Sequence, residues 1–154
     1  MDTLTLRVAH AQDSDVADLV RTHFALMRAS SPEESCHVMP ADALAANGAL
    51  VLAADFHGRL AGIGALAEID ATHGEIKSMH TAKDQRGKGV GRFILTGLID
   101  SAKNKGFRRL SLETGSAELF APARALYASF GFVKCAPFAN YTCDPFSVFM
   151  SRNV

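Results

Sequence analysis

The sequence has no excess of charge of either sign, and this absence limits the partners that the protein can have. Its 154 residues include 16 Lys and Arg residues and 16 Asp and Glu residues, so the formal net charge is zero. Proteins that bind nucleic acid or anionic membranes through a broad surface usually carry a basic excess. We therefore expect neither nucleic acid nor membrane as a partner, although the balance leaves room for a local basic patch.

Cysteine and histidine are too few and too scattered for disulfides or metal sites. The three cysteines, Cys36, Cys135 and Cys143, are odd in number and lack the paired spacing of metal ligands. No two of the six His residues stand four positions apart, so we expect no metal and in particular no zinc. The cysteines are predicted to be free thiols in a reducing compartment.

Long hydrophobic runs are also absent from the sequence. The longest apolar run, around residues 49–54, is far shorter than the roughly 20 residues that a membrane-spanning helix needs. The opening segment, MDTLTLRVAH, lacks the basic and apolar parts of a secretory signal. We therefore expect a cytoplasmic protein.

The bulk composition is that of one soluble domain. Hydrophobic residues make up 48% of the chain and charged residues 21%, which is ordinary for a globular protein. The length is sufficient to bury a core, and the sequence shows no repeat, low-complexity tract or linker. We expect a single domain over residues 1–154, and the sequence leaves open whether it forms a homodimer.

Hydrophobic periodicity predicts strands and helices in the order β-α-α-β-β-β-α-β-α-β-β. Alternating apolar residues predict strands over residues 3–9, 49–55, 59–69, 75–81, 109–114, 132–135 and 147–151. Helical spacing predicts helices that follow Asp13, that cover residues 41–46 and 122–130, and that run from residue 90 to about Lys105. Short turns make the central strands antiparallel, whereas the strands flanking the long helix should be parallel. The expected fold is a mixed α/β sheet covered by helices.

A glycine-rich turn precedes the longest predicted helix. The turn, residues 85–91 (QRGKGVG), holds three glycines among basic side chains. Glycine lets the backbone turn sharply and approach a ligand closely. The first N–H groups of a helix lack intrahelical partners, and that end is partly positive. This combination predicts an anion site, most naturally one for phosphate.

Two familiar phosphate-binding patterns do not fit this turn. A nucleoside-triphosphate loop needs a Lys followed by Ser or Thr, whereas Arg92 and Phe93 follow Gly91 here. A dinucleotide site needs G-x-G-x-x-G, whereas Gly87, Gly89 and Gly91 give G-x-G-x-G. The spacing therefore excludes both readings.

A third pattern does fit. The run R-x-x-G-x-G from Arg86 to Gly91 resembles the acyl-CoA-binding signature of the GNAT N-acetyltransferase superfamily. The resemblance covers residues 75–132 and includes A-x-x-L-Y-x-x-x-G-F from Ala123 to Phe132, while the earlier half of the chain matches only in its order of elements. The later residues resemble a bacterial subgroup of acetyltransferases. The resemblance implies a GNAT fold and an acetyl-CoA-dependent N-acetyltransferase.

The resemblance also implies where acetyl-CoA binds. Amides of the glycine turn would hold the pyrophosphate and basic side chains would neutralise it. The pantetheine arm would lie along the preceding strand, and a main-chain N–H near Met79 would face the thioester carbonyl. The implied cofactor-binding residues are Met79, His80, Thr81, Arg86, Gly87, Lys88, Gly89, Val90, Gly91 and Arg92.

Two residues occupy positions at which family members carry catalytic groups. Tyr127 matches the general acid, which would protonate the departing thiolate, although it could instead be a core tyrosine. Glu75 matches a general base that works through water, although it could instead form a cross-strand ion pair. Period-two geometry predicts Glu75, Lys77, Met79 and Thr81 on one face of the strand, where Lys77 could pair with Glu75.

The sequence departs from the family pattern at one position. Family members often carry an asparagine seven residues before the tyrosine, and here that residue is Phe120. The polar contact to the pantetheine arm must be absent or supplied by Thr114, Ser116 or main chain.

The acceptor side is implied by the loops that form its walls in this fold. His37, Tyr141 and Lys77 are predicted on the substrate side, although His37 could be a plain surface residue. The zero net charge and Lys77 favour a small polar or acid-bearing amine over a basic protein tail.

The predicted activity is acetyl transfer from acetyl-CoA to a primary amine of a small molecule. Direct attack in a ternary complex is favoured because no cysteine occupies the reaction centre, with Cys135 as the nearest candidate. One alternative is a non-catalytic acyl-CoA-binding sensor or scaffold. Another is a longer acyl donor, for which Gly62, Gly64 and Ala65 could leave room.

Overall fold

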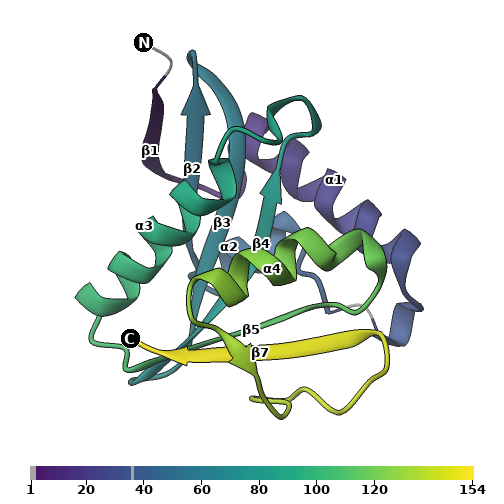
Figure 1. Ribbon diagram of the computed structural model, residues 1–154. Helices are drawn as coiled ribbons and strands as arrows, with labels where there is room; N and C mark the ends of the chain where they lie inside the picture. The colour runs from purple at the N-terminus through teal and green to yellow at the C-terminus, as the bar shows by residue number, and fades with distance from the viewer. Residues whose placement is uncertain (1–2, 36) are drawn as a thin grey trace.

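The computed structural model describes residues 3–35 and 37–154 and is built on a seven-stranded sheet with helices on both faces (Figure 1). The strand order is β1-β2-β3-β4-β5-β7-β6. The strands are β1 (Leu4–Ala9), β2 (Leu50–Phe56), β3 (Arg59–Asp70), β4 (His73–Thr81), β5 (Arg109–Gly115), β6 (Val133–Lys134) and β7 (Ser147–Asn153). The helices are α1 (Ser14–Ser30), α2 (Ala41–Ala46), α3 (Val90–Asn104) and α4 (Ala121–Ser129), with short 3-10 helices η1 (Glu33–Ser35), η2 (Lys83–Gln85) and η3 (Glu118–Phe120).

The predicted α/β fold class and element order are confirmed. The pair β4–β5 is parallel, and the other strand pairs of the sheet are antiparallel. Helix α3 connects β4 to β5, which supplies the long crossover that parallel neighbours need. The sheet is therefore mostly antiparallel, with its parallel pair on either side of the long helix in sequence.

The hydrophobic core lies in two layers, one on each face of the sheet (Figure 1). Helices α3 and α4 cover one face, where Ile94, Leu95 and Leu98 are fully buried. Helix α1 covers the other, where Val16 and Val20 are buried. Each such side chain contributes about 1.5–3 kcal/mol relative to exposure, so the apolar stripes hold the helices in place.

The ends of some elements differ from the sequence prediction. Residues 29–40 are polar and contain two prolines, which predicts a loop, but helix α1 continues to Ser30. The Oγ atoms of Ser30 and Ser31 donate to the carbonyls of Leu26 and Met27, at 2.6 and 3.1 Å. These bonds satisfy carbonyls in the last turn, which extends the helix through polar residues.

A bulge interrupts β4 in the middle of the sheet. Ile63 pairs with His80 and Ala65 with Lys77, so two residues of β4 lie opposite one residue of β3. Ser78 adopts a left-handed conformation with φ +55°. A Cβ added to Gly64 would lie 2.7 Å from the sulfur of Met79. Glycines inside a strand, here Gly62 and Gly64 of β3, predict a bulge or close packing, and this prediction is confirmed.

The bulge overturns the prediction that four residues of β4 share one face. Lys77 pairs with Ala65, which belongs to the core under α1. Beyond the bulge Met79 packs into the core under α3, and Thr81 pairs with Gly62, which faces Val90 of that helix. The extra residue resets the alternation of side chains, so Met79 and Thr81 lie opposite Glu75 and Lys77.

The parallel pair separates before its strands end. Pairing runs from His73 with Arg109 to Ile76 with Leu112, while β4 continues to Thr81 and β5 to Gly115. Beyond these pairs each strand still pairs with its other neighbour, but an opening separates the end of β4 from the end of β5. This opening positions the candidate site.

Other predictions can be checked on the described part of the chain. None of its helices is long and apolar enough to cross a membrane. Cys135 and Cys143 are free thiols, as predicted, and Cys36 lies outside the described residues.

Candidate active site

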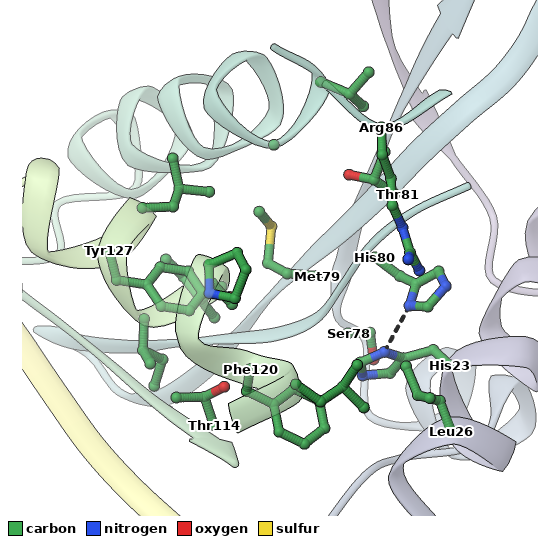
Figure 2. Close-up of a pocket in the computed structure, with 18 of the residues that line it drawn as sticks. His23, Leu26, Ser78, Met79, His80, Thr81, Arg86, Thr114, Phe120 and Tyr127 are labelled. Carbon is green, nitrogen blue, oxygen red and sulfur yellow. Dashed lines mark hydrogen bonds between the residues drawn. The ribbon is translucent and has the colours of Figure 1, made fainter. Parts of the chain in front are cut away.

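A cavity of about 440 Å³ occupies the opening between β4 and β5 (Figure 2). Its walls come from α1, the second half of β4, the glycine turn, the end of β5 and α4. In Figure 2, Met79 lies at its centre, with Tyr127 and Thr114 on one side and His80 and Arg86 on the other. The cavity therefore joins the glycine turn to the predicted catalytic tyrosine.

The glycine turn forms one end of this cavity. Gly87 and Gly89 have φ of +80°, a left-handed conformation that L side chains rarely adopt. A Cβ at either residue would meet nothing within 4 Å, so conformation rather than crowding requires glycine. No side chain caps the start of α3, and its first turn holds no acidic residue. Its free N–H groups suit an anion.

The predicted basic residues of the turn point in different directions. Arg86 and Arg92 both line the cavity. Lys88 instead donates from Nζ to Gln85 Oε1 at 3.0 Å and lies 4.7 Å from the centre of the Phe56 ring. Arg92 is engaged as well, because its Nη1 donates to Ser129 Oγ at 3.3 Å and its guanidinium lies 5.0 Å from the centre of the Phe130 ring. Arg86 is thus the predicted cation best placed to reach an anion in the cavity, while Lys88 can contribute through its main chain.

The bulged part of β4 supplies polar main chain and a hydroxyl to the cavity. Met79, His80 and Thr81 line it, as does Ser78. A bulge leaves the extra residue outside the regular hydrogen-bond ladder, so its main-chain groups can serve a ligand. The Oγ atom of Ser78 is buried and has no hydrogen-bond partner within residues 3–35 and 37–154. An orphan buried hydroxyl at a cavity wall indicates a ligand contact.

Tyr127 presents a protonated phenol to the cavity. It is 6% exposed, lies on α4 and packs edge-on against Phe132 at 6.1 Å between ring centres. Burial raises the pKa of Tyr127, and the charge of Glu113 raises it further. The phenol therefore keeps its proton at neutral pH and can donate a hydrogen bond, and its raised pKa makes it a weaker acid than a free tyrosine.

A second cavity, of about 40 Å³, lies on the α1 face of the same opening. It shares six wall residues with the larger cavity: His23, Met27, Ile76, Lys77, Ser78 and Glu113. The two spaces are therefore adjacent compartments of one site, which meet at the bulge and the end of the β4–β5 pairing.

The predicted substrate-side residues meet around this second cavity. Glu75 Oε2 accepts hydrogen bonds from Lys77 Nζ at 3.2 Å and from the Tyr141 hydroxyl at 2.5 Å. Lys77 Nζ also donates to that hydroxyl at 3.0 Å, and the ring of His37 lies edge-on to Tyr141 at 5.0 Å. Burial and then the charge of Glu75 raise the pKa of Tyr141, so its hydroxyl donates. The expected Lys77–Glu75 pair is present.

Glu113 lines both cavities and was not among the predicted site residues. It follows Leu112, the last residue of β5 that pairs with β4. Burial raises the pKa of its carboxyl, and an interaction with the Ser147 hydroxyl, followed by the charges of His37 and Lys77, partly offsets this rise. The alternation of the strand does indicate that Glu113 is a polar residue beside the core, because Ser111 and Glu113 form the polar face of that strand. The sequence gives no sign, however, that the strand parts from its neighbour there.

A pair of histidines joins α1 to β4 at the cavity wall (Figure 2). The Nδ1 atoms of His23 and His80 are 3.0 Å apart. Burial, followed by the charge of His80, lowers the pKa of His23 to about 3. Burial and then Arg86 lower the pKa of His80. Both rings are neutral at pH 7, so one donates to the other. His80 was predicted at the cofactor, whereas His23 was missed.

Phe120 occupies the place of the expected asparagine and closes one side of the cavity. Its ring covers Gly115 so closely that a Cβ there would clash. Ser116 donates from Oγ to the carbonyl of Pro145 at 2.7 Å, whereas Thr114 lines the cavity. Of the two hydroxyls proposed as replacements, only Thr114 is in position.

The glycines of β3 leave no space for a longer acyl chain. An added Cβ would lie 2.7 Å from Val90 at Gly62 and 2.7 Å from Ile94 at Gly64. Their missing side chains are replaced by α3 and Met79, so the room expected there for a larger donor is already filled.

Comparisons with known proteins agree with one another. The sequence model of the acetyltransferase (GNAT) family matches residues 16–132. The uncharacterized N-acetyltransferase YsnE of Bacillus subtilis is 46% identical over 90% of this chain and 92% of its own. An IAA acetyltransferase of Azospirillum brasilense is 36% identical over 79% of this chain and 78% of its own. A GNAT family acetyltransferase from Elizabethkingia anophelis, solved with acetyl-CoA bound, superposes over all of both chains with a TM-score of 0.74 and 20% identity.

Proposed function

Since this chain belongs to the GNAT family of acetyltransferases, we propose that it moves the acetyl group of acetyl-CoA to a primary amine of a small molecule. One observation carries the proposal: the large cavity reaches from the glycine turn to Tyr127 and shares a wall with a second cavity. A donor in the first and an acceptor in the second would meet at the bulge of β4. Acetyl transfer needs this proximity of two substrates.

The large cavity is the proposed donor side. The free N–H groups at the start of α3, with Arg86 and Arg92, would hold the pyrophosphate of acetyl-CoA. The pantetheine arm would run along β4 beside Met79, His80 and Thr81. The thioester carbonyl would then face main chain at the bulge, where an N–H group stabilises the negative charge that develops during attack.

Tyr127 is the proposed general acid. The amine nitrogen attacks the thioester carbon, the C–N bond forms and the C–S bond breaks. The departing sulfur takes the phenolic proton of Tyr127, and the proton that the nitrogen loses on becoming an amide restores the phenol, whose pKa is raised by burial and by Glu113. Neither described cysteine lines either cavity, and Cys135 lines a separate surface depression. This supports direct attack in a ternary complex over an acyl-cysteine route.

Two carboxylates compete for the role of general base. Glu75, the residue expected from the family pattern, accepts hydrogen bonds from Lys77 and Tyr141 and lines only the smaller cavity. Glu113 lines both cavities, and burial raises the pKa of its carboxyl, which makes it a stronger base than a free glutamate. We therefore assign the role of general base to Glu113. Glu75 is assigned the role of holding the Lys77 side chain in place. Glu75 stays the alternative base.

The direct test is turnover with acetyl-CoA across a panel of primary amines, measured as release of the CoA thiol and as acetylated product by mass spectrometry. Thiol release that depends on an amine, with matching product, supports the proposal. Tight calorimetric binding of acetyl-CoA without thiol release from any amine would favour the sensor or scaffold alternative.

A further inference from the structure

The charges around the smaller cavity sum to one negative. With the wall residues His23 and His37 counted as neutral, its charged wall residues are the carboxylates Glu75 and Glu113 and the ammonium of Lys77. Ser78 also lines this cavity, and its buried hydroxyl, which has no hydrogen-bond partner among the described residues, can accept a hydrogen bond. A single bound ammonium would therefore bring the compartment to neutrality, would give Ser78 a donor, and would favour the charged form of Glu113.

Lys77 is already engaged and is not free to receive a carboxylate of the acceptor. Its side chain and that of Glu75 are each 10% exposed and lie 3.2 Å apart. Its ammonium also donates to Tyr141. A substrate carboxylate would have to displace Glu75 from this pair and leave it uncompensated in a poorly solvated site, which is costly. The geometry therefore opposes the acid-bearing acceptor expected from the sequence.

The remaining walls are apolar or aromatic. Met27, Val38 and Met39 line the cavity, and methionine adapts its shape to a ligand easily. The ring of Tyr141 is backed by Phe138 at 5.0 Å and Phe149 at 5.6 Å between ring centres. These walls suit a hydrocarbon body behind the reacting nitrogen and offer no further charge.

We infer that the acceptor is a small primary amine with a single positive charge, an apolar body and no carboxylate. The inference rests on the proposed function and deepens it. The charge stays balanced through the reaction: the ammonium gives one proton to Glu113, and the free amine bonds to the acetyl carbon as the C–S bond breaks. The thiolate takes the proton of Tyr127, and the second proton that the nitrogen loses restores the phenol. An amino acid would leave one negative charge without a partner, and a diamine would add one positive charge.

Three acceptors of one chain length test this inference: n-butylamine, 4-aminobutyrate and 1,4-diaminobutane. Their reacting ends are alike, and only the far ends differ in charge. We expect kcat/KM, measured by thiol release, to be at least about tenfold higher for n-butylamine than for either other compound, which corresponds to about 1.4 kcal/mol. A kcat/KM for 4-aminobutyrate or 1,4-diaminobutane that equals or exceeds that of n-butylamine would overturn the inference.

Glu75→Gln sharpens the test because it is isosteric and releases Lys77. The freed ammonium should pair with the far-end carboxylate of 4-aminobutyrate. The kcat/KM for 4-aminobutyrate divided by that for n-butylamine should therefore rise by about tenfold. Lys134→Met, which removes an ammonium from the separate depression beside Cys135, is the control and should leave the ratio unchanged. An unchanged ratio in folded Glu75→Gln would contradict the role given to Lys77.

Binding separates failure of the inference from failure of the proposed function. If none of the three compounds releases thiol, the proposed function is weakened. Calorimetry on the protein saturated with CoA then still ranks the three amines. Tightest binding of n-butylamine supports the acceptor class, and equal or tighter binding of 4-aminobutyrate overturns it.

Discussion

The two sides of the site are built in different ways. The proposed donor side is made of backbone geometry within one continuous stretch, residues 76–92, which contains the bulge at Ser78 and the left-handed glycines before α3. The proposed acceptor side is made of side chains from separate elements: His37 beyond α1, Glu75 and Lys77 on β4, Glu113 on β5 and Tyr141 before β7. A cosubstrate bound by local backbone can be inferred from a motif. An acceptor bound by distant side chains needs the tertiary fold.

Glu113 gives the largest expected effect and tests the acceptor side. Glu113→Gln keeps the shape but removes the basic oxygen, so kcat should fall about 10²- to 10⁴-fold while the affinity for acetyl-CoA stays near that of the wild type. Stopped-flow or steady-state thiol release measures kcat, and calorimetry measures the affinity. Glu118→Gln on η3 is the matched control. Should Glu75→Gln abolish turnover while Glu113→Gln retains it, the base is Glu75, as the sequence predicted.

A substitution at Gly89 tests the donor side through the affinity for acetyl-CoA. Gly89→Glu forces a side chain into a left-handed residue and places a carboxylate at the proposed pyrophosphate site. The affinity for acetyl-CoA should fall by about a hundredfold, since like charges repel at short range. Gly48→Glu is the matched control, because Gly48 has φ +69°, open space around its Cα and no place at the cavity. Both variants should lose about 1–2 kcal/mol of folding stability. Equal affinities in the two would refute the phosphate assignment.

The contrast between the two sides also explains how far the sequence could be read. The glycine turn at Arg86–Gly91 is local, so its residues predicted the anion site, and the resemblance of residues 75–132 to the GNAT pattern implied the fold around it. Glu113 was missed because its position matters only where β5 parts from β4, which depends on the whole sheet. The sequence also predicted Met79 on the wrong face of β4, for a similar reason. One bulged residue, invisible to a period-two pattern, moves every later side chain of β4 to the other face.

Tyr127 lies where the two sides meet. Tyr127→Phe removes the proposed acid without changing the packing against Phe132, so kcat should fall ten- to hundredfold with little change in acetyl-CoA affinity. Because the pKa of Tyr127 is raised, the wild-type rate should show no loss from its ionisation between pH 7 and 9.

Tyr141→Phe is the contrasting variant. It loses the bond to Glu75 and should raise KM for the amine more than it lowers kcat. Identical effects of both substitutions would contradict the division of roles.

The histidine pair that joins α1 to β4 gives the smallest expected effect, and it concerns stability. His23 is buried with a pKa of about 3, against a reference value of 6.5. Because the folded state resists protonation, the stability contributed by neutral His23 is complete above pH 6.5 and is lost as the pH falls toward 3. The unfolding free energy should drop by about 2 kcal/mol from this residue between pH 7 and 5.

Urea unfolding at the two pH values should show a smaller drop in unfolding free energy in His23→Gln than in the wild type. The exposed His10→Gln is the control, and it should follow the wild type. An equal acid sensitivity in His23→Gln would show that the α1–β4 contact does not depend on a neutral imidazole.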